Sequence, residues 1–225
     1  MLTYNVRDLK DDASSVAHVM RSCRPDVVCL QEVPRRLGAG RRVRRLAREC
    51  GLRWSAGGRG SGGTAVLTAP RVEVLSSGVG RLAVAGPLTR TRGYSLVRLR
   101  GLTVVSVHLP LRETERLAHV AAVLDRLRDA GPCVVAGDLN ELPDGPSWAA
   151  LAALVADPGG CGPTYPARAP TRRIDAVLTT SGVAVTRLSV AGPTEQLWPQ
   201  DLRAASDHLP VIADLAVWTL EVPAR

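Results

Sequence analysis

Runs of apolar residues, each broken by turn residues, divide the chain into short strands and amphipathic helices. Residues 2–4 and 27–30 form two apolar runs of strand length, and between them apolar side chains recur at helical spacing over residues 16–23. Asp12 stands where a helix N-cap is expected. The first part of the chain therefore predicts a strand, a helix and a second strand.

A second amphipathic helix and a sheet follow. The apolar residues within 43–50 fall on one helical face, arginines lie largely on the others, and Gly51 is suited to end the helix. Between residues 57 and 109, Gly-rich turns separate short β-branched runs, which predicts antiparallel sheet. The expected strands are 64–67, 72–75, 94–99 and 102–108.

The C-terminal half alternates helices and strands. Residues 113–130 carry apolar side chains along one helical side, residues 133–136 form an apolar run of strand length, and a short helix is expected around residues 148–155. A loop rich in Pro and Gly then extends to residue 173, and a further loop is expected before Asp207. The last expected strands are 174–178, 183–189 and 211–217.

Length and composition agree with a single domain. A chain of 225 residues with 45% hydrophobic residues can bury a substantial core, and no linker divides it. We therefore expect one domain over residues 1–225. Strands before, between and after helices favour an α/β (α+β) architecture, a layered sandwich in which two sheets pack together with helices outside.

The net charge of +8 admits a nucleic-acid partner without requiring one. An excess of arginine attracts polyanions regardless of their sequence. However, Lys10 is the only lysine among the 29 basic residues, and the chain is also rich in Ala, Gly, Val and Pro and lacks Phe. A GC-rich coding sequence would produce the same bias. We therefore expect an anionic substrate, with nucleic acid as one candidate.

Several features favour a cytoplasmic location. The first residues lack the basic and apolar regions of a signal peptide, and no apolar run approaches the ~20 residues that span a membrane. The five cysteines show neither Cys-x-x-Cys pairing nor a nearby histidine at zinc-ligand spacing, so we expect free thiols in a reducing compartment. No protein partner can be inferred from the sequence.

Polar residues recur at, or just beyond, the ends of the apolar runs. In α/β sheets ligands collect outside the strand ends, so a shared site explains this recurrence better than independent accidents do. Taken singly, Asn5 is more typical of a turn and Glu32 of a solvated loop charge, and the two histidines are also compatible with structural roles. The candidate site residues are Asn5, Glu32, His108, Asp138, Asn140, Asp175, Asp207 and His208.

Three of these residues are suited to a metal ion. Asn5, Glu32 and Asp207 offer hard oxygen ligands of the kind that Mg²⁺ prefers, while the same set disfavours zinc. Magnesium commonly uses one or two carboxylates and completes its coordination with water and substrate phosphate oxygens. We therefore expect a Mg²⁺ cofactor, with Mn²⁺ as a substitute.

The other five residues are suited to the hydrolysis of a phosphoester. His108 and His208 can donate hydrogen bonds to a phosphate, and Asp138 with Asn140 can orient an attacking water. A carboxylate at Asp175 would fix the tautomer of a histidine and favour its protonated form. Phosphoester hydrolysis needs such groups because charge builds on the phosphate as it is attacked.

Six short blocks, spread from residue 4 to residue 208, resemble the endonuclease/exonuclease/phosphatase superfamily and occur in that family's order. The resemblance implies the DNase-I-like fold, a four-layer sandwich of two packed mixed β-sheets flanked by helices, and metal-dependent cleavage of phosphoesters. It also implies that Asn5 and Glu32 hold the metal with Asp207 close to it. The blocks are Tyr4-Asn5-Val6, Leu30-Gln31-Glu32, Val107-His108-Leu109, Gly137-Asp138-Leu139-Asn140, Arg173-Ile174-Asp175 and Ser206-Asp207-His208.

The same resemblance implies catalytic roles. His108 and Asn140 would contact the scissile phosphate, and Asp138 would orient the water. Asp175 would pair with His208. Whether His208 or Asp138 is the general base stays open at this point.

Three arginines are candidates for substrate binding. Arg35 and Arg36 directly follow the Glu32 block and are expected to receive a phosphate that flanks the reacting one. Arg203, in the expected loop before Asp207, is placed to border the same cleft.

The substrate class remains open between several phosphoesters. The first expectation is a phosphodiesterase or nuclease-type activity. Alternatives are a phosphomonoesterase and a phospholipid or inositol-phosphate hydrolase, although three Tyr, four Trp and no Phe leave few aromatic side chains for membrane insertion or base stacking. A non-enzymatic alternative is a metal-binding module of the same fold without turnover.

Overall fold

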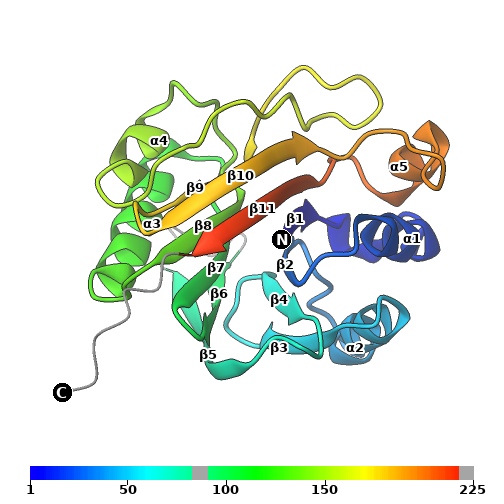
Figure 1. Ribbon diagram of the computed structural model, residues 1–225, viewed down its shortest axis with the longest axis horizontal. Coiled ribbons are helices and arrows are strands. Elements are labelled where there is room, and N and C mark those ends of the chain that lie inside the picture. Colours follow the sequence, from blue (N-terminus) through cyan, green and yellow to red (C-terminus); the bar gives the residue numbers. More distant parts are fainter. Residues whose placement is uncertain (83–90, 218–225) are drawn as a thin grey trace.

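The computed structural model describes residues 1–82 and 91–217. The other residues of the predicted domain 1–225, which are 83–90 and 218–225, lie outside this description. Two mixed sheets face each other, as expected (Figure 1). The six-stranded sheet has the order β10(Val183–Val190), β11(Val211–Val217), β1(Leu2–Asn5), β2(Val27–Gln31), β4(Ala65–Thr68), β3(Arg53–Gly57). The five-stranded sheet has the order β5(Val74–Leu82), β6(Arg92–Leu99), β7(Leu102–His108), β8(Cys133–Asp138), β9(Asp175–Thr179).

Each sheet is built around one parallel strand pair joined by a helix. β1 and β2 are parallel and connected by α1(Ala13–Cys23), and β7 and β8 are parallel and connected by α3(Glu113–Leu127). The first helix begins where the sequence predicts, because the Asp12 side chain accepts the backbone N–H of Ser14 at 2.9 Å. The neighbours of both parallel pairs are antiparallel, so the carboxyl ends of the central strands meet the amino ends of the strands beside them.

Three apolar cores lie between the four layers of the sandwich, which are helices, sheet, sheet and helices. One packs the six-stranded sheet against α1, α2(Ala39–Glu49) and α5(Pro199–Ala205), and another packs the five-stranded sheet against α3 and α4(Pro146–Leu151). The third lies between the sheets and consists mainly of valines, with Val66, Val104 and Val134 fully buried. Figure 1 shows the two groups of helices on opposite outer sides. The predicted fold class is therefore confirmed.

The antiparallel pairing expected between residues 57 and 109 is confirmed, but it is divided between the two sheets, because β4 pairs with β2 and β3 whereas β5, β6 and β7 belong to the opposite sheet. The sequence analysis missed the strand β3 and one helix. The expected loop before Asp207 contains the helix α5. Apolar periodicity does not reveal this helix because it is short and buries only Leu202 and Ala205. Its start is fixed instead by Asp201, whose carboxylate accepts the backbone N–H of Trp198 at 2.9 Å.

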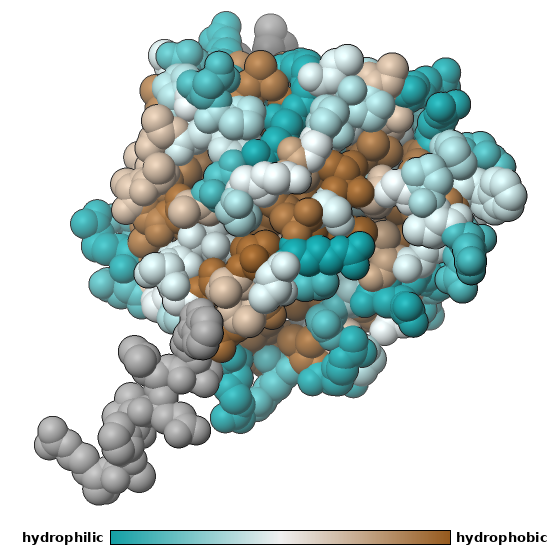
Figure 2. All heavy atoms as spheres, turned by 45° about the horizontal axis from the view of Figure 1, so that its top comes forward, coloured by the Kyte–Doolittle hydropathy of each residue, from teal (hydrophilic) through white to brown (hydrophobic). Residues whose placement is uncertain are grey.

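On the face shown in Figure 2, hydrophobic patches are interrupted by hydrophilic residues. All five cysteines are free, which agrees with the sequence expectation. In the described ranges, none of the helices has the length and apolar character needed to cross a membrane.

Candidate active site

The strand register brings most of the predicted residues to one edge of the two sheets. His108 at the end of β7 pairs with Asp138 at the end of β8, and Asp138 pairs in turn with Asp175 at the start of β9. In the opposite sheet, Asn5 ends β1 beside Gln31, the residue before Glu32. Because each sheet contributes its central strand ends, the two halves of the site face each other across the sandwich.

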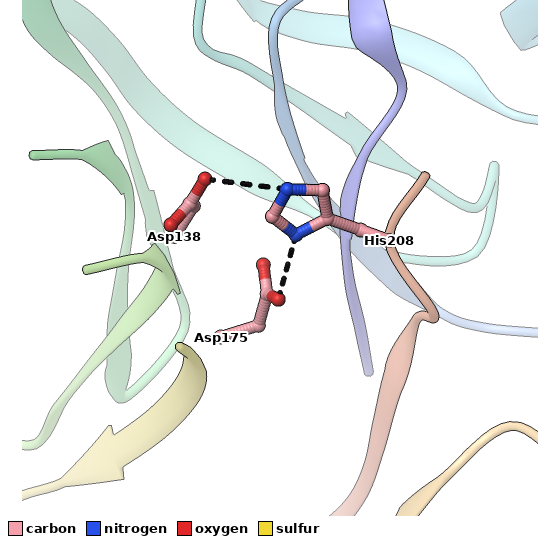
Figure 3. A group of neighbouring side chains, drawn as sticks. All are labelled: Asp138, Asp175 and His208. Carbon is pink, nitrogen blue, oxygen red and sulfur yellow. Dashed lines mark hydrogen bonds and ion pairs between the residues drawn. The ribbon is translucent and has the colours of Figure 1, made fainter. Parts of the chain in front are cut away.

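Asp138 lies at the centre of this arrangement. Its Oδ2 accepts a hydrogen bond from Asn5 Nδ2 at 3.0 Å, and it lies 3.4 Å from His108 Nε2 and 3.8 Å from His208 Nε2. Its Oδ1 accepts the backbone N–H of Asn140 at 2.9 Å. Three side chains from segments far apart in the sequence therefore converge on one buried carboxylate oxygen, as Figure 3 shows for His208.

His208 and Asp175 form the predicted pair. His208 Nδ1 lies 2.9 Å from Asp175 Oδ2, and both side chains are buried (Figure 3). The same carboxylate oxygen accepts a hydrogen bond from Thr164 Oγ1 at 2.6 Å, and the Tyr165 ring lies 4.9 Å from the His208 ring, centroid to centroid. The imidazole is thus fixed in position with Nε2 directed at Asp138.

The surroundings of His208 and Asp138 raise the pKa of both groups. Burial lowers the pKa of His208, but the charge of Asp175 and its hydrogen bond outweigh burial and raise that pKa to about 9. Burial, with a contribution from the charge of Asp175, raises the pKa of the Asp138 carboxyl, and the nearby His208 opposes this shift. Near neutral pH, His208 is therefore a cation with a proton on both nitrogens, while the Asp138 carboxyl is more basic than an ordinary one.

Arg92, which the sequence analysis did not select, fixes the tautomer of His108. Its Nη1 lies 3.2 Å from His108 Nδ1, and both side chains are buried. Since a guanidinium only donates hydrogen bonds, Nδ1 is the acceptor in this contact, so the ring proton resides on Nε2. His108 consequently presents an N–H group toward Asp138 and the space in front of it.

A layer of buried polar residues supports the site between the sheets. Gln31 Nε2 lies 3.1 Å from Thr3 Oγ1 and 3.1 Å from Ser106 Oγ, and Ser106 Oγ donates to the Leu30 carbonyl at 2.9 Å. These bonds join β1 and β2 to β7. Because buried polar groups are costly when unpaired, this network favours one relative position of the two sheets.

Two backbone features explain the residue types of the Gly-Asp-x-Asn block. A Cβ at Gly137 would lie 1.9 Å from the Val107 carbonyl oxygen, so only glycine permits this close approach of β7 and β8. Asn140 has a φ of 53°, a left-handed conformation that asparagine tolerates well, and its Nδ2 donates to the Leu109 carbonyl at 2.8 Å. The second N–H of this amide group can serve a ligand.

The three residues predicted to hold a metal, Asn5, Glu32 and Asp207, offer oxygen ligands of the kind that Mg²⁺ prefers. Asn5 Oδ1 accepts the backbone N–H of Arg7 at 3.1 Å and retains a second lone pair. Asp207 is half-buried and lies 3.1 Å from Arg7 Nε. Glu32 is also half-buried, and its φ of 50° is a costly conformation for a non-glycine residue. Such strain at a strand end is typical of functional sites.

A second group of possible metal ligands lies deeper. Asp138, Asp175 and His208 offer ligand atoms that all lie within 4.8 Å of one another. Both nitrogens of His208 already face carboxylates, and the raised pKa favours a proton on each of them. The protonated histidine therefore fits this group better than a cation does.

The three arginines predicted to bind substrate have different surroundings. Arg35 Nη1 donates to the Thr91 carbonyl at 2.8 Å, so part of its side chain holds the local backbone. Arg36 is exposed and lines a hollow next to the site. Arg203 is exposed on α5, and no described contact joins it to the residues around Asp138.

The described contacts also include residues that sequence reasoning missed. Arg92 and Thr164 each touch a predicted catalytic side chain. Arg92 is one of many arginines, and Thr164 lies in a loop rich in Pro and Gly, so neither carries a sequence signal of its own.

Comparison with known protein families finds a match over nearly the whole chain. A profile described as "Endonuclease/Exonuclease/phosphatase family" matches residues 2–208. No curated protein matches the sequence significantly.

Solved structures of similar proteins share the fold. A conserved protein of unknown function from Enterococcus faecalis is 21% identical with a TM-score of 0.77, and the match covers 97% of this chain and 100% of that one. A mannosyl-6-phosphatase from Bacteroides thetaiotaomicron is 17% identical with a TM-score of 0.76, covering 96% and 98%. An endonuclease/exonuclease/phosphatase protein from Beutenbergia cavernae is 24% identical with a TM-score of 0.73, covering 100% and 72%.

Proposed function

Because the chain belongs to the endonuclease/exonuclease/phosphatase family, we propose that it is a magnesium-dependent hydrolase of phosphodiester bonds. Members of this family are hydrolases that act on phosphoester bonds, and they generally use a divalent metal. The observation that carries the proposal is the convergence of Asn5, His108 and His208 on Asp138 Oδ2. A carboxylate surrounded by hydrogen-bond donors is suited to hold a water next to a phosphate.

In this mechanism Asp138 is the general base. His208 carries a proton on both nitrogens near neutral pH, because its pKa is raised to about 9, and it cannot accept another. The raised pKa of the Asp138 carboxyl makes it the better acceptor for the proton of the attacking water. The alternative left open by the sequence, with His208 as the base, is disfavoured by this difference.

The two histidines stabilise the charge that builds on the phosphate. His208 Nε2–H and His108 Nε2–H both point to the space in front of Asp138, one as a cation and the other as a neutral donor held by Arg92. The free N–H of the Asn140 amide adds a third donor. Donors fixed before the reaction stabilise the transition state without the cost of reorganisation.

Asn5, Glu32 and Asp207 would hold the magnesium ion. When bound, the ion would neutralise part of the phosphate charge and polarise the phosphorus–oxygen bond. Manganese is expected to substitute for it because both ions accept oxygen ligands. We also propose a cytoplasmic location, since five free thiols fit a reducing compartment.

The test compares a diester with a monoester. Bis-p-nitrophenyl phosphate and p-nitrophenyl phosphate are assayed side by side with Mg²⁺, with Mn²⁺ and with EDTA. The proposal expects hydrolysis of the diester that EDTA abolishes. Hydrolysis of the monoester alone would shift the assignment to a phosphatase, the activity in the name of the Bacteroides structure. Turnover that survives EDTA would refute the metal dependence.

A further inference from the structure

A hollow of about 780 Å³ opens beside the candidate active site. Val33, the residue after Glu32, forms part of its wall, and Gly62 forms another part. Gly62 packs against Arg92 so closely that a Cβ on this glycine would lie 2.7 Å from the Arg92 Cα. Because Arg92 contacts His108, a short chain of contacts leads from the hollow to the catalytic carboxylate.

The lining of this hollow is strongly basic. Five arginines contribute to it, and all five are exposed; they are Arg35, Arg36, Arg44, Arg59 and Arg81. No aspartate or glutamate is among the described lining residues. Concave walls of one charge focus the electrostatic potential, so an anion inside the hollow is attracted more strongly than on an open surface.

The arginines also retain capacity to bind. Among these five arginines, the described contacts show only Arg35 donating to neighbouring carbonyls, and they include no carboxylate ion pair of Arg36, Arg44, Arg59 or Arg81. Arg44 lies over the Trp54 ring, 5.0 Å from its centroid, a contact that positions the guanidinium without neutralising it.

The start of α2 adds to the same field. Gly38 is the N-cap of this helix, no side chain caps it, and Gly38 and Ala39 both line the hollow. The positive end of the helix dipole favours an anion at this position, although the Ala39 N–H already donates to the Arg36 carbonyl at 2.9 Å. Guanidinium forks and helix N-termini are both typical partners of phosphate oxygens.

We propose that this arginine hollow binds a second phosphate group of the substrate, separate from the phosphate that is hydrolysed. The inference rests on the proposed function, because it assigns the hollow to the substrate of the same site. The substrate class is therefore a compound with at least two phosphate groups. That chemistry is shared by a nucleic acid strand and by a small molecule with several phosphates.

The test measures binding without turnover. Wild-type protein in EDTA is titrated with fluorescein-labelled octathymidylate, followed by anisotropy, and separately with inositol hexakisphosphate, followed by calorimetry. The double variant Arg44→Gln/Arg59→Gln removes two charges from the hollow. The matched control, Arg41→Gln/Arg48→Gln, removes two exposed charges from α2 outside the hollow.

The proposal expects the hollow variant to raise the Kd of the tighter probe at least about tenfold, and the control to stay within about twofold. For the oligonucleotide, the slope of log K against log salt should fall by about 1.4 for two lost phosphate contacts. Tighter binding of one probe identifies the substrate as a strand or as a small molecule. Equal effects of both double variants, or no binding of either probe, would overturn the proposal.

A second measurement locates the bound phosphate. The indole N–H of Trp54 donates to the Ala56 carbonyl at 2.7 Å, and its resonance should shift when a probe fills the hollow. An unshifted resonance at saturation would place the ligand elsewhere and refute the assignment. If the wild-type protein binds a probe through these arginines but hydrolyses no ester, the proposed function is contradicted. If the enzyme is active but the hollow variant binds the probes as the control variant does, only the assignment of the hollow is contradicted.

Discussion

The substitution Asp175→Asn should lower the pKa of His208 and slow hydrolysis. Asp175 Oδ2 lies 2.9 Å from His208 Nδ1, and the carboxylate is the main cause that raises the histidine pKa against burial. An asparagine keeps the shape and can still accept the hydrogen bond, but it carries no charge. The charges of Asp138 and Asp207 still raise the pKa of His208, but the largest opposing contribution to burial is gone, so this pKa should fall well below its wild-type value.

The magnitude follows from the pKa of His208. The difference between 6.5 and about 9 corresponds to about 3 kcal/mol of extra stabilisation of the protonated histidine. A histidine with a raised folded-state pKa stabilises the fold fully below its unfolded-state pKa of 6.5, and it loses this contribution as the pH rises through about 9. The metal-free wild type should therefore lose about 3 kcal/mol of unfolding free energy over this range, and the variant should lose little.

Two assays check this prediction. The imidazole carbon-bound proton of His208 is titrated by NMR in EDTA, and urea unfolding is measured between pH 6 and 9.5. In addition, kcat for diester hydrolysis at pH 7 should fall by about 10² to 10³, the range for loss of one preorganised donor to the transition state. Asp144→Asn, an exposed carboxylate outside the site, serves as the control.

The reasoning fails if His208 in the variant still titrates near 9. It also fails if wild type and Asp175→Asn lose the same unfolding free energy between pH 6.5 and 9. Either result would mean that the Asp175 charge does not stabilise the protonated histidine.

Four further substitutions test other parts of the site. Asn5→Ala and Glu32→Ala should each raise the Mg²⁺ concentration needed for half-maximal turnover, and unaltered metal titrations for both would remove them from the metal site. Gly137→Ala should lower the unfolding free energy by about 3 kcal/mol or more in urea denaturation, because its Cβ would lie 1.9 Å from a backbone oxygen of β7; a normal midpoint would disprove this close approach. Arg92→Gln should reduce kcat by about tenfold with little change in KM, because His108 loses its fixed tautomer. The control Arg98→Gln, on the same strand as Arg92, should have no such effect.

The architecture was predictable because strand ends and helix faces leave clear patterns in this sequence. The runs around Tyr4, Leu30, Val107 and Ala136 are all strands, and the polar residue after each run lies at the shared edge. The domain count over residues 1–225 stays a prediction.

The parts that were missed depend on contacts between distant residues. Helix α5 was missed because its stability comes from packing on α1 and from one capping carboxylate rather than from a long apolar face. Arg92 and Thr164 reach the site only through strand pairing and loop closure.

The most direct test of the central claim is the kcat/KM of wild type and Asp138→Asn for bis-p-nitrophenyl phosphate with Mg²⁺. Asparagine cannot take the proton of the attacking water, so kcat/KM should fall by at least about 10², while Asp129→Asn, an exposed control, should keep wild-type activity. Circular dichroism should show that both variants are folded. A folded Asp138→Asn enzyme with wild-type kcat/KM would contradict the claim that Asp138 is the base at the centre of this site.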